Sequence, residues 1–288
     1  MTWAPLLALT AALGFGVAGV FLKRGLQYAS PFTAAVVSVT FTAVFIWVLA
    51  VATVPLEPLL TWRILPFLAA GLVAPGLARL VLFVGVHRVG LARAAPLVAT
   101  APLFSVAMAI LLLGERPGWR LLAGAAGIVA GGVLLSRRGG AEPAWRRRDL
   151  VFPLLAALGF AVRDILSRYG FRDYEHPLLA AAAATVTSLV AVWLFTGLWR
   201  PAGGLRVPRV GLGFLALSGL AEGLAYLAMW RALAYGDVSL VSPLINAQSI
   251  FALALTAIFL RDLERVTWRM AAAAALIVGG VAVVVRSV

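Results

Sequence analysis

The sequence has no cysteine, only two histidines and few charged residues, since Asp, Glu, Lys and Arg make up 12% of its 288 residues. Without cysteine, disulfide bonds and cysteine-based metal sites are excluded. We find no His-Glu-x-x-His arrangement, no paired Asp motif and no Walker-type glycine loop. These absences argue against a membrane-embedded enzyme and against ATP as the direct energy source. We therefore expect no enzymatic activity, no metal and no cofactor.

Apolar residues, in contrast, make up 63% of the chain, where a soluble domain has about half. About 20 apolar residues are needed to cross a hydrocarbon core roughly 30 Å thick. The sequence offers ten such stretches, at 3–21, 32–54, 64–86, 94–113, 119–135, 150–166, 177–199, 210–230, 238–260 and 268–285. It therefore predicts an all-α, polytopic membrane protein with ten transmembrane helices, which has the lipid bilayer as a partner.

The chain also repeats itself. Matching segments include Ala12-Leu13-Gly14-Phe15 with Ala157-Leu158-Gly159-Phe160, Pro96-Leu97 with Pro243-Leu244, and Trp119-Arg120 with Trp268-Arg269. We divide the chain into a first repeat (1–136), a cytoplasmic linker (137–149) and a second repeat (150–288). Because each repeat holds five spans, an odd number, the second must be inverted relative to the first. Inverted repeats are typical of secondary transporters, whose site lies between the halves near mid-membrane.

The net charge of +13 does not indicate nucleic-acid binding, because the arginines lie between apolar stretches, where they set orientation. Connections on the side of the 137–149 linker hold about twice as many basic residues as those on the other side. The positive-inside rule then predicts that both termini lie outside. We expect a multi-pass protein of the plasma membrane, the inner membrane of a bacterium.

Ionisable residues inside a membrane are costly and mark functional sites by default. Arg79 lies in the third span and Glu222 in the eighth, which are equivalent spans of the two repeats. We expect both to line a central cavity that binds a small-molecule substrate, together with Tyr226, Asn246 and Gln248. The alternative is a buried ion pair between Arg79 and Glu222 that only holds the halves together.

A second group of charges lies in the sixth span. Arg168 follows Asp164 by four residues, a spacing at which an acid and a base meet on one helix face. We predict a local ion pair that eases insertion, with a gating or proton-carrying role as the alternative. Arg163 is expected to point elsewhere. His87 and His176 fall in connections, where metal binding is not expected.

Prolines inside spans bend helices, because proline lacks the backbone donor and clashes with the preceding turn. We expect breaks at Pro75-Gly76 and a matched pair at Pro96 and Pro243, which occupy equivalent positions. Matched breaks near the repeat interface point to a substrate pathway. The alternative is that they only shape the packed bundle.

Small residues on two helix faces predict close packing. The faces are Gly124, Gly127 and Gly131 in the fifth span, and Ala272, Ala275 and Gly279 in the tenth. Packing within the monomer is the simpler interpretation, and a homodimer through these helices is the other.

The segment Leu91–Leu135 carries a resemblance to a known family. Its Pro96, its Gly114-Glu115-Arg116 turn and its Gly-rich end resemble the close of each repeat in the drug/metabolite transporter superfamily, EamA type. Near each first helix that family usually has Trp-Gly, where this chain has Phe15-Gly16 and Phe160-Ala161. The resemblance covers essentially the whole chain. It implies a ten-helix carrier with a central cavity, which typically exports amino acids, other metabolites or toxic compounds.

Taken together, these patterns predict a secondary transporter that works by alternating access and exports a small metabolite such as an amino acid or an amphipathic compound. Opposite charges at mid-membrane suit a zwitterion, with Arg79 binding its carboxylate and Glu222 its amine. A flippase for a lipid-linked substrate, built on the same fold, is the alternative.

Overall fold

The computed structural model describes residues 3–89, 94, 97–136, 146–199, 206–259 and 268–287, and within these ranges it contains helices and no strand. The predicted spans correspond to α1 (Ala4–Gly25), α2 (Pro31–Thr53), α3 (Leu65–Gly71) with η3 (Leu72–Leu77) and α4 (Ala78–Val89), α6 (Ala101–Met108) with η4 (Ala109–Leu113), α7 (Trp119–Ser136), α8 (Val151–Gly170), α9 (Pro177–Trp199), α10 (Arg209–Tyr235), α11 (Val238–Asn246) with α12 (Gln248–Phe259), and α13 (Trp268–Arg286). Short 3₁₀ turns η1 (Glu57–Leu59), η2 (Trp62–Ile64) and η5 (Arg147–Leu150) lie in the connections. Residues 137–145 of the expected linker fall outside the described ranges.

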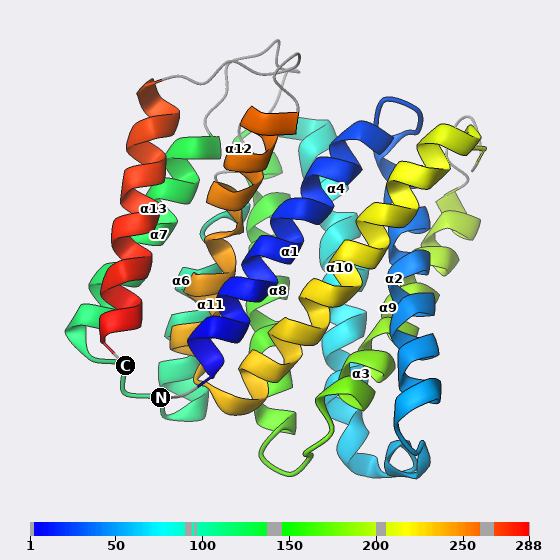
Figure 1. Ribbon diagram of the computed structural model, residues 1–288, viewed down its shortest axis with the longest axis horizontal. Helices are drawn as coiled ribbons and strands as arrows, with labels where there is room; N and C mark the ends of the chain where they lie inside the picture. Colours follow the sequence, from blue (N-terminus) through cyan, green and yellow to red (C-terminus); the bar gives the residue numbers. More distant parts are fainter. Residues whose placement is uncertain are drawn as a thin grey trace.

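Seven described helices are long and apolar enough to cross a membrane, and three shorter apolar helices complete the ten spans. Successive spans run in opposite directions through the bundle (Figure 1). Both termini therefore lie at one end of the molecule, the end at which α10 passes into α11. We call it the terminus end. With five spans in each half, the second half is inverted relative to the first, as predicted.

The halves interlock, because the first helix of each packs on the third span of the other. A Cβ atom on Gly14 of α1 would lie 2.9 Å from the Cβ of Ala225 on α10. A Cβ on Gly159 of α8 would lie the same 2.9 Å from the Cβ of Ala78 on α4. Glycine permits this approach because helix association in lipid depends on van der Waals fit. One contact is thus made twice, as a pseudo-twofold axis requires.

The fifth and tenth spans, α7 and α13, pack against each other within the monomer. A Cβ on Gly124 would lie 2.8 Å from the Gly280 carbonyl oxygen, and one on Gly131 would lie 2.7 Å from that of Ala273. The predicted glycine face of α7 is therefore used inside the chain. A homodimer stays a prediction.

On α13 the predicted face was wrong. The buried positions are Ala273, Ile277, Gly280 and Val284, whereas Ala272 is only half-buried and Ala275 and Gly279 are exposed. The buried face alternates small residues with the branched Ile277 and Val284. A search for small residues alone therefore did not find it.

The third span is broken at Pro75. The backbone of Ala74 has non-helical angles (φ −150°, ψ 131°), and η3 carries Pro75 and Gly76. Pro75 has no N–H to donate to the carbonyl of Gly71, four residues earlier. The Ser188 hydroxyl of α9 lies 2.7 Å from that carbonyl oxygen and donates to it. A neighbouring side chain thus supports the broken helix, as is usual where lipid offers no water.

The fourth and ninth spans are interrupted at equivalent positions. Residues 99 and 100 form a turn before α6, and Ala247 separates α11 from α12. Pro243 lies inside α11, so the interruption follows the proline by four residues. Pro96, its predicted counterpart, lies outside the described residues. Residues on either side of both breaks line one cavity between the halves, among them Val98, Ala101, Asn246 and Gln248.

Candidate functional site

A cavity of about 250 Å³ lies between the two halves. Its wall includes all five residues predicted to bind substrate, namely Arg79, Glu222, Tyr226, Asn246 and Gln248. The other lining residues are Phe15, Leu82, Val98, Ala101, Pro102, Phe160, Arg163, Asp164, Ser242 and Ile245. The wall is thus apolar over much of its area, with a few polar groups that converge from different helices, which is the usual character of a ligand site.

The central polar contact joins the halves. The Arg79 Nη2 of α4 donates to the Glu222 Oε1 of α10 across 2.5 Å. The side chains are 21% and 9% exposed, so both charges are largely withdrawn from solvent. The other terminal nitrogen of Arg79, Nη1, is buried and has no hydrogen-bond partner among the described residues. This guanidinium therefore keeps donor capacity beyond its partner in the protein.

A second ion pair involves Arg163 and Asp164 of α8. Arg163 donates from Nε (3.0 Å) and Nη2 (2.7 Å) to the Asp164 Oδ1, and the Ser105 hydroxyl donates to Oδ2 at 3.1 Å. Both carboxylate oxygens of Asp164 are therefore engaged. The second pair lies in a single helix, whereas the first crosses between the halves.

The predicted pair between Asp164 and Arg168 was wrong. Arg168 instead donates to the Leu233 and Ala234 carbonyls and to Asp237. The expectation that Arg163 points elsewhere was wrong as well. Its long side chain reaches the carboxylate of Asp164, its neighbour in the sequence. The signal for Arg163 in the sequence was its position inside a span, which alone marks a charge as a functional candidate.

Aromatic rings enclose the charged groups. Phe15 of α1 meets Tyr226 edge to face, with ring centroids 5.5 Å apart. The Arg163 guanidinium lies 5.4 Å from the centre of the Phe160 ring, within the range of a cation–π contact. Tyr226 lines the same cavity as Arg79 and Arg163. Phe15 and Phe160, which stand where Trp-Gly was expected, both line the cavity.

The broken ninth span contributes the neutral polar groups. Asn246 and Gln248 flank the interruption at Ala247, and the Asn246 Nδ2 donates to the Ala99 carbonyl at 3.3 Å. Ala99 lies at the equivalent break of the fourth span, so the two breaks meet across the axis. Ser242 lies one turn earlier on α11 and also lines the cavity.

The site thus combines two cations, two anions and aromatic walls, which suits noncovalent recognition of a charged small molecule. Over the described residues, no three His, Asp or Glu side chains group as metal ligands.

The fold and both halves of the chain match known proteins. One solved structure, described as "Crystal structure of protein", superposes with a TM-score of 0.80 at 22% sequence identity, over 97% of this chain and 95% of that chain. At that identity the likeness concerns the fold alone. A search of curated proteins found no match. The model of the EamA-like transporter family matches residues 2–137 and again residues 149–286. Since both halves match, the chain belongs to the EamA-like transporter family of integral membrane proteins.

Proposed function

We propose that this protein is a secondary carrier that exports a small zwitterion, such as an amino acid, by alternating access. The observation that carries the proposal is the ion pair between Arg79 and Glu222 on the wall of the cavity, with one partner from each half. A substrate that binds both charges contacts both halves at once. Substrate binding is thereby coupled to the relative position of the halves, which alternating access requires.

Recognition follows from exchange of ionic partners. The substrate carboxylate accepts hydrogen bonds from Arg79, whose Nη1 has no partner among the described residues. Its ammonium group binds Glu222. Each charge of the protein then keeps an opposite charge beside it, so neither is left uncompensated in a low dielectric. An analogue that lacks one of the two charges leaves a protein charge unpaired and is rejected.

The size of the cavity supports a small metabolite over the lipid-linked alternative. A volume of about 250 Å³ is smaller than the roughly 300–1,000 Å³ of most sites for drug-sized ligands. It therefore suits a molecule of the size of an amino acid. The aromatic rings of Phe15 and Phe160 supply contact area for its apolar part.

Counterflow into proteoliposomes tests the proposal. Purified protein is assayed with labelled amino acids, with the corresponding amines and with the corresponding carboxylic acids. We expect exchange of the zwitterions only, and its loss in Glu222→Gln, in which the amide oxygen still accepts a hydrogen bond but carries no charge. Glu57→Gln, at an exposed acid outside the spans, is the matched control. Normal counterflow in Glu222→Gln, or equal exchange of the amines, would contradict the proposal. Loss of folded protein in Glu222→Gln would instead favour a purely structural pair.

A further inference from the structure

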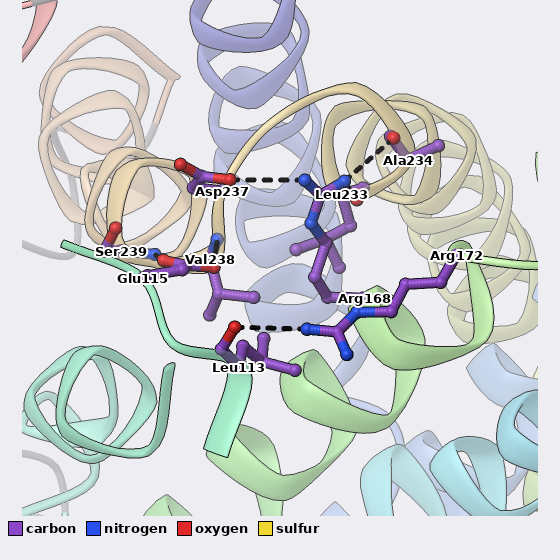
Figure 2. A network of polar contacts seen from close by, with 9 residues as sticks. All are labelled: Leu113, Glu115, Arg168, Arg172, Leu233, Ala234, Asp237, Val238 and Ser239. Carbon is purple, nitrogen blue, oxygen red and sulfur yellow. Dashed lines mark hydrogen bonds and ion pairs between the residues drawn. The ribbon is translucent and has the colours of Figure 1, made fainter. Parts of the chain in front are cut away.

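Glu115 of the first half caps a helix of the second half. Its Oε1 accepts from the backbone N–H of Val238 at 2.8 Å, and its Oε2 accepts from that of Ser239 at 2.9 Å (Figure 2). These groups belong to the first turn of α11, whose N–H groups have no partner within the helix. The helix's own N-cap residue, Asp237, makes no side-chain cap. The carboxylate that stabilises this helix end therefore comes from across the interface.

Two arginines complete the network. Arg168 of α8 donates to the Leu233 carbonyl at 3.3 Å and the Ala234 carbonyl at 3.0 Å, near the end of α10. It also donates to the Asp237 carboxylate at 3.2 Å. Arg172 then donates to the Leu113 carbonyl of the first half at 3.1 Å. Figure 2 shows these residues converging on the turn between α10 and α11.

The network lies at the terminus end, directly beyond the cavity. Arg168 follows Asp164, a cavity residue, by four positions on α8, a rise of about 6 Å. Ser239 precedes Ser242, another cavity residue, by three positions on α11, a rise of about 4.5 Å. The three helices that the network ties together, α8, α10 and α11, supply Asp164, Glu222 and Ser242 to the cavity. It therefore forms the floor of the site.

We propose that Glu115 is the latch of a gate that closes the cavity toward the terminus end. Its bonds to Val238 and Ser239 join the halves, and a carboxylate that accepts two N–H groups at a helix start makes strong, charge-assisted hydrogen bonds. Release of Glu115 frees the start of α11 to move away from the first half and opens this end. The inference rests on the proposed alternating access, but it concerns a different part of the molecule from the ion pair of Arg79 and Glu222.

Thiol accessibility tests the latch, and the absence of native cysteine makes single-thiol variants directly interpretable. Ser242→Cys places a thiol in the cavity, and Ser287→Cys, after the last helix, reports which membrane face carries the termini. Each is treated in oriented vesicles with a membrane-impermeant methanethiosulfonate reagent from one face at a time. We expect Ser242→Cys alone to react from the face opposite the termini. With Glu115→Ala added, the reaction from the terminus face should accelerate about fivefold, which is the factor that corresponds to the loss of one helix-capping interaction of about 1 kcal/mol.

Glu57→Ala in the Ser242→Cys background is the control for loss of one acid, and it should leave both rates unchanged. Glu115→Gln retains one acceptor oxygen and should give an intermediate rate. If Glu115→Ala does not fold, the rate of Glu115→Gln decides whether Glu115 holds the gate closed. An unchanged rate from the terminus face in both Glu115 variants would overturn the latch. Protection of the Ser242→Cys thiol by amino acids tests the substrate separately. A working latch without such protection leaves the gate standing and removes the proposed substrate.

Discussion

The two halves supply equivalent positions to the cavity, and the apolar residues at these positions are alike, whereas the charged ones are not. Phe15 of the first half corresponds to Phe160 of the second, and Val98 corresponds to Ile245. The charges have no such counterparts. The contacts of Gly14 with Ala225 and of Gly159 with Ala78 align the third and eighth spans so that Arg79 corresponds to Tyr226. By the same alignment, Glu222 corresponds to Pro75.

This difference separates the features that the two halves share from those that only one half has. The apolar walls, the small-residue contacts between halves and the paired helix breaks are present twice, so they belong to the scaffold. Each charged residue of the cavity is present once, and three of the four lie in the second half. A polar substrate with two distinct ends requires such asymmetry, because a symmetric site would bind it equally well in two opposite orientations.

The largest expected effect concerns Arg79, which is the cavity's charged residue from the first half. Arg79→Met leaves Glu222 buried without its partner, and we expect the free energy of unfolding to fall by about 3 kcal/mol. In the double variant Arg79→Met/Glu222→Met, apolar side chains replace the pair, and most of that stability should return. Transport should be absent from both variants. Thermal unfolding in detergent, followed by tryptophan fluorescence, and counterflow measure the two properties.

The double variant is the decisive member of that set. If it regained transport along with stability, the pair would be no more than a connection between the halves. If it stayed inactive while unfolding like the wild type, the charges act on the substrate.

The architecture could be predicted from the sequence because its causes are local or periodic. Apolar stretches of membrane length gave the ten spans, and the repeat of Ala-Leu-Gly-Phe with an odd number of spans gave the inversion. The buried face of α13 was not predicted correctly. Which face a helix buries depends on the partner that packs against it, and Ile277 packs against Gly131 of α7, a contact that a search for small residues on α13 does not detect.

The five residues predicted to bind substrate all line the cavity, and the sequence could single them out because polar side chains are rare inside apolar spans. Their role in binding stays a prediction. The ionic partners of Asp164 and Arg168 were assigned wrongly. A spacing of four residues gives two side chains the opportunity to meet but does not exclude competitors. Leu233, Ala234 and Asp237 offer Arg168 the unpaired carbonyls of a helix end and a second carboxylate, and these partners come together only in the folded bundle.

The next prediction compares two equivalent glycines, Gly14 in the first half and Gly159 in the second. Alanine at Gly14 would meet the Ala225 Cβ at 2.9 Å and also its Cα at 3.2 Å, whereas alanine at Gly159 would meet the Ala78 Cβ at 2.9 Å and its Cα only at 3.7 Å. Overpacking of this kind costs about 1–3 kcal/mol. We expect Gly14→Ala to lower the free energy of unfolding by about 2 kcal/mol and Gly159→Ala by about 1 kcal/mol.

The gain in helix propensity from glycine to alanine is common to both variants, so the difference between them reports the packing alone. Equal shifts in the unfolding temperature would show that both contacts adjust equally well to the added methyl group. The difference between the two Cβ–Cα distances would then have no effect on stability.

The smallest effect compares two hydroxyl groups that join the halves at equivalent positions. The Ser188 hydroxyl donates to the Gly71 carbonyl at 2.7 Å, and the Thr42 hydroxyl donates to the Gly219 carbonyl at 2.8 Å. Pro75 deprives Gly71 of its α-helical donor, while α10 continues unbroken through Gly219. Ser188→Ala should therefore lower the free energy of unfolding by about 1 kcal/mol, and Thr42→Val, which replaces the hydroxyl with a methyl group, by a few tenths of a kcal/mol. Thermal unfolding of both variants measures the difference. If Thr42→Val had as large an effect as Ser188→Ala, both hydroxyl groups would stabilise the contact between helices to the same extent. The Ser188 hydroxyl would then have no special role at the break near Pro75.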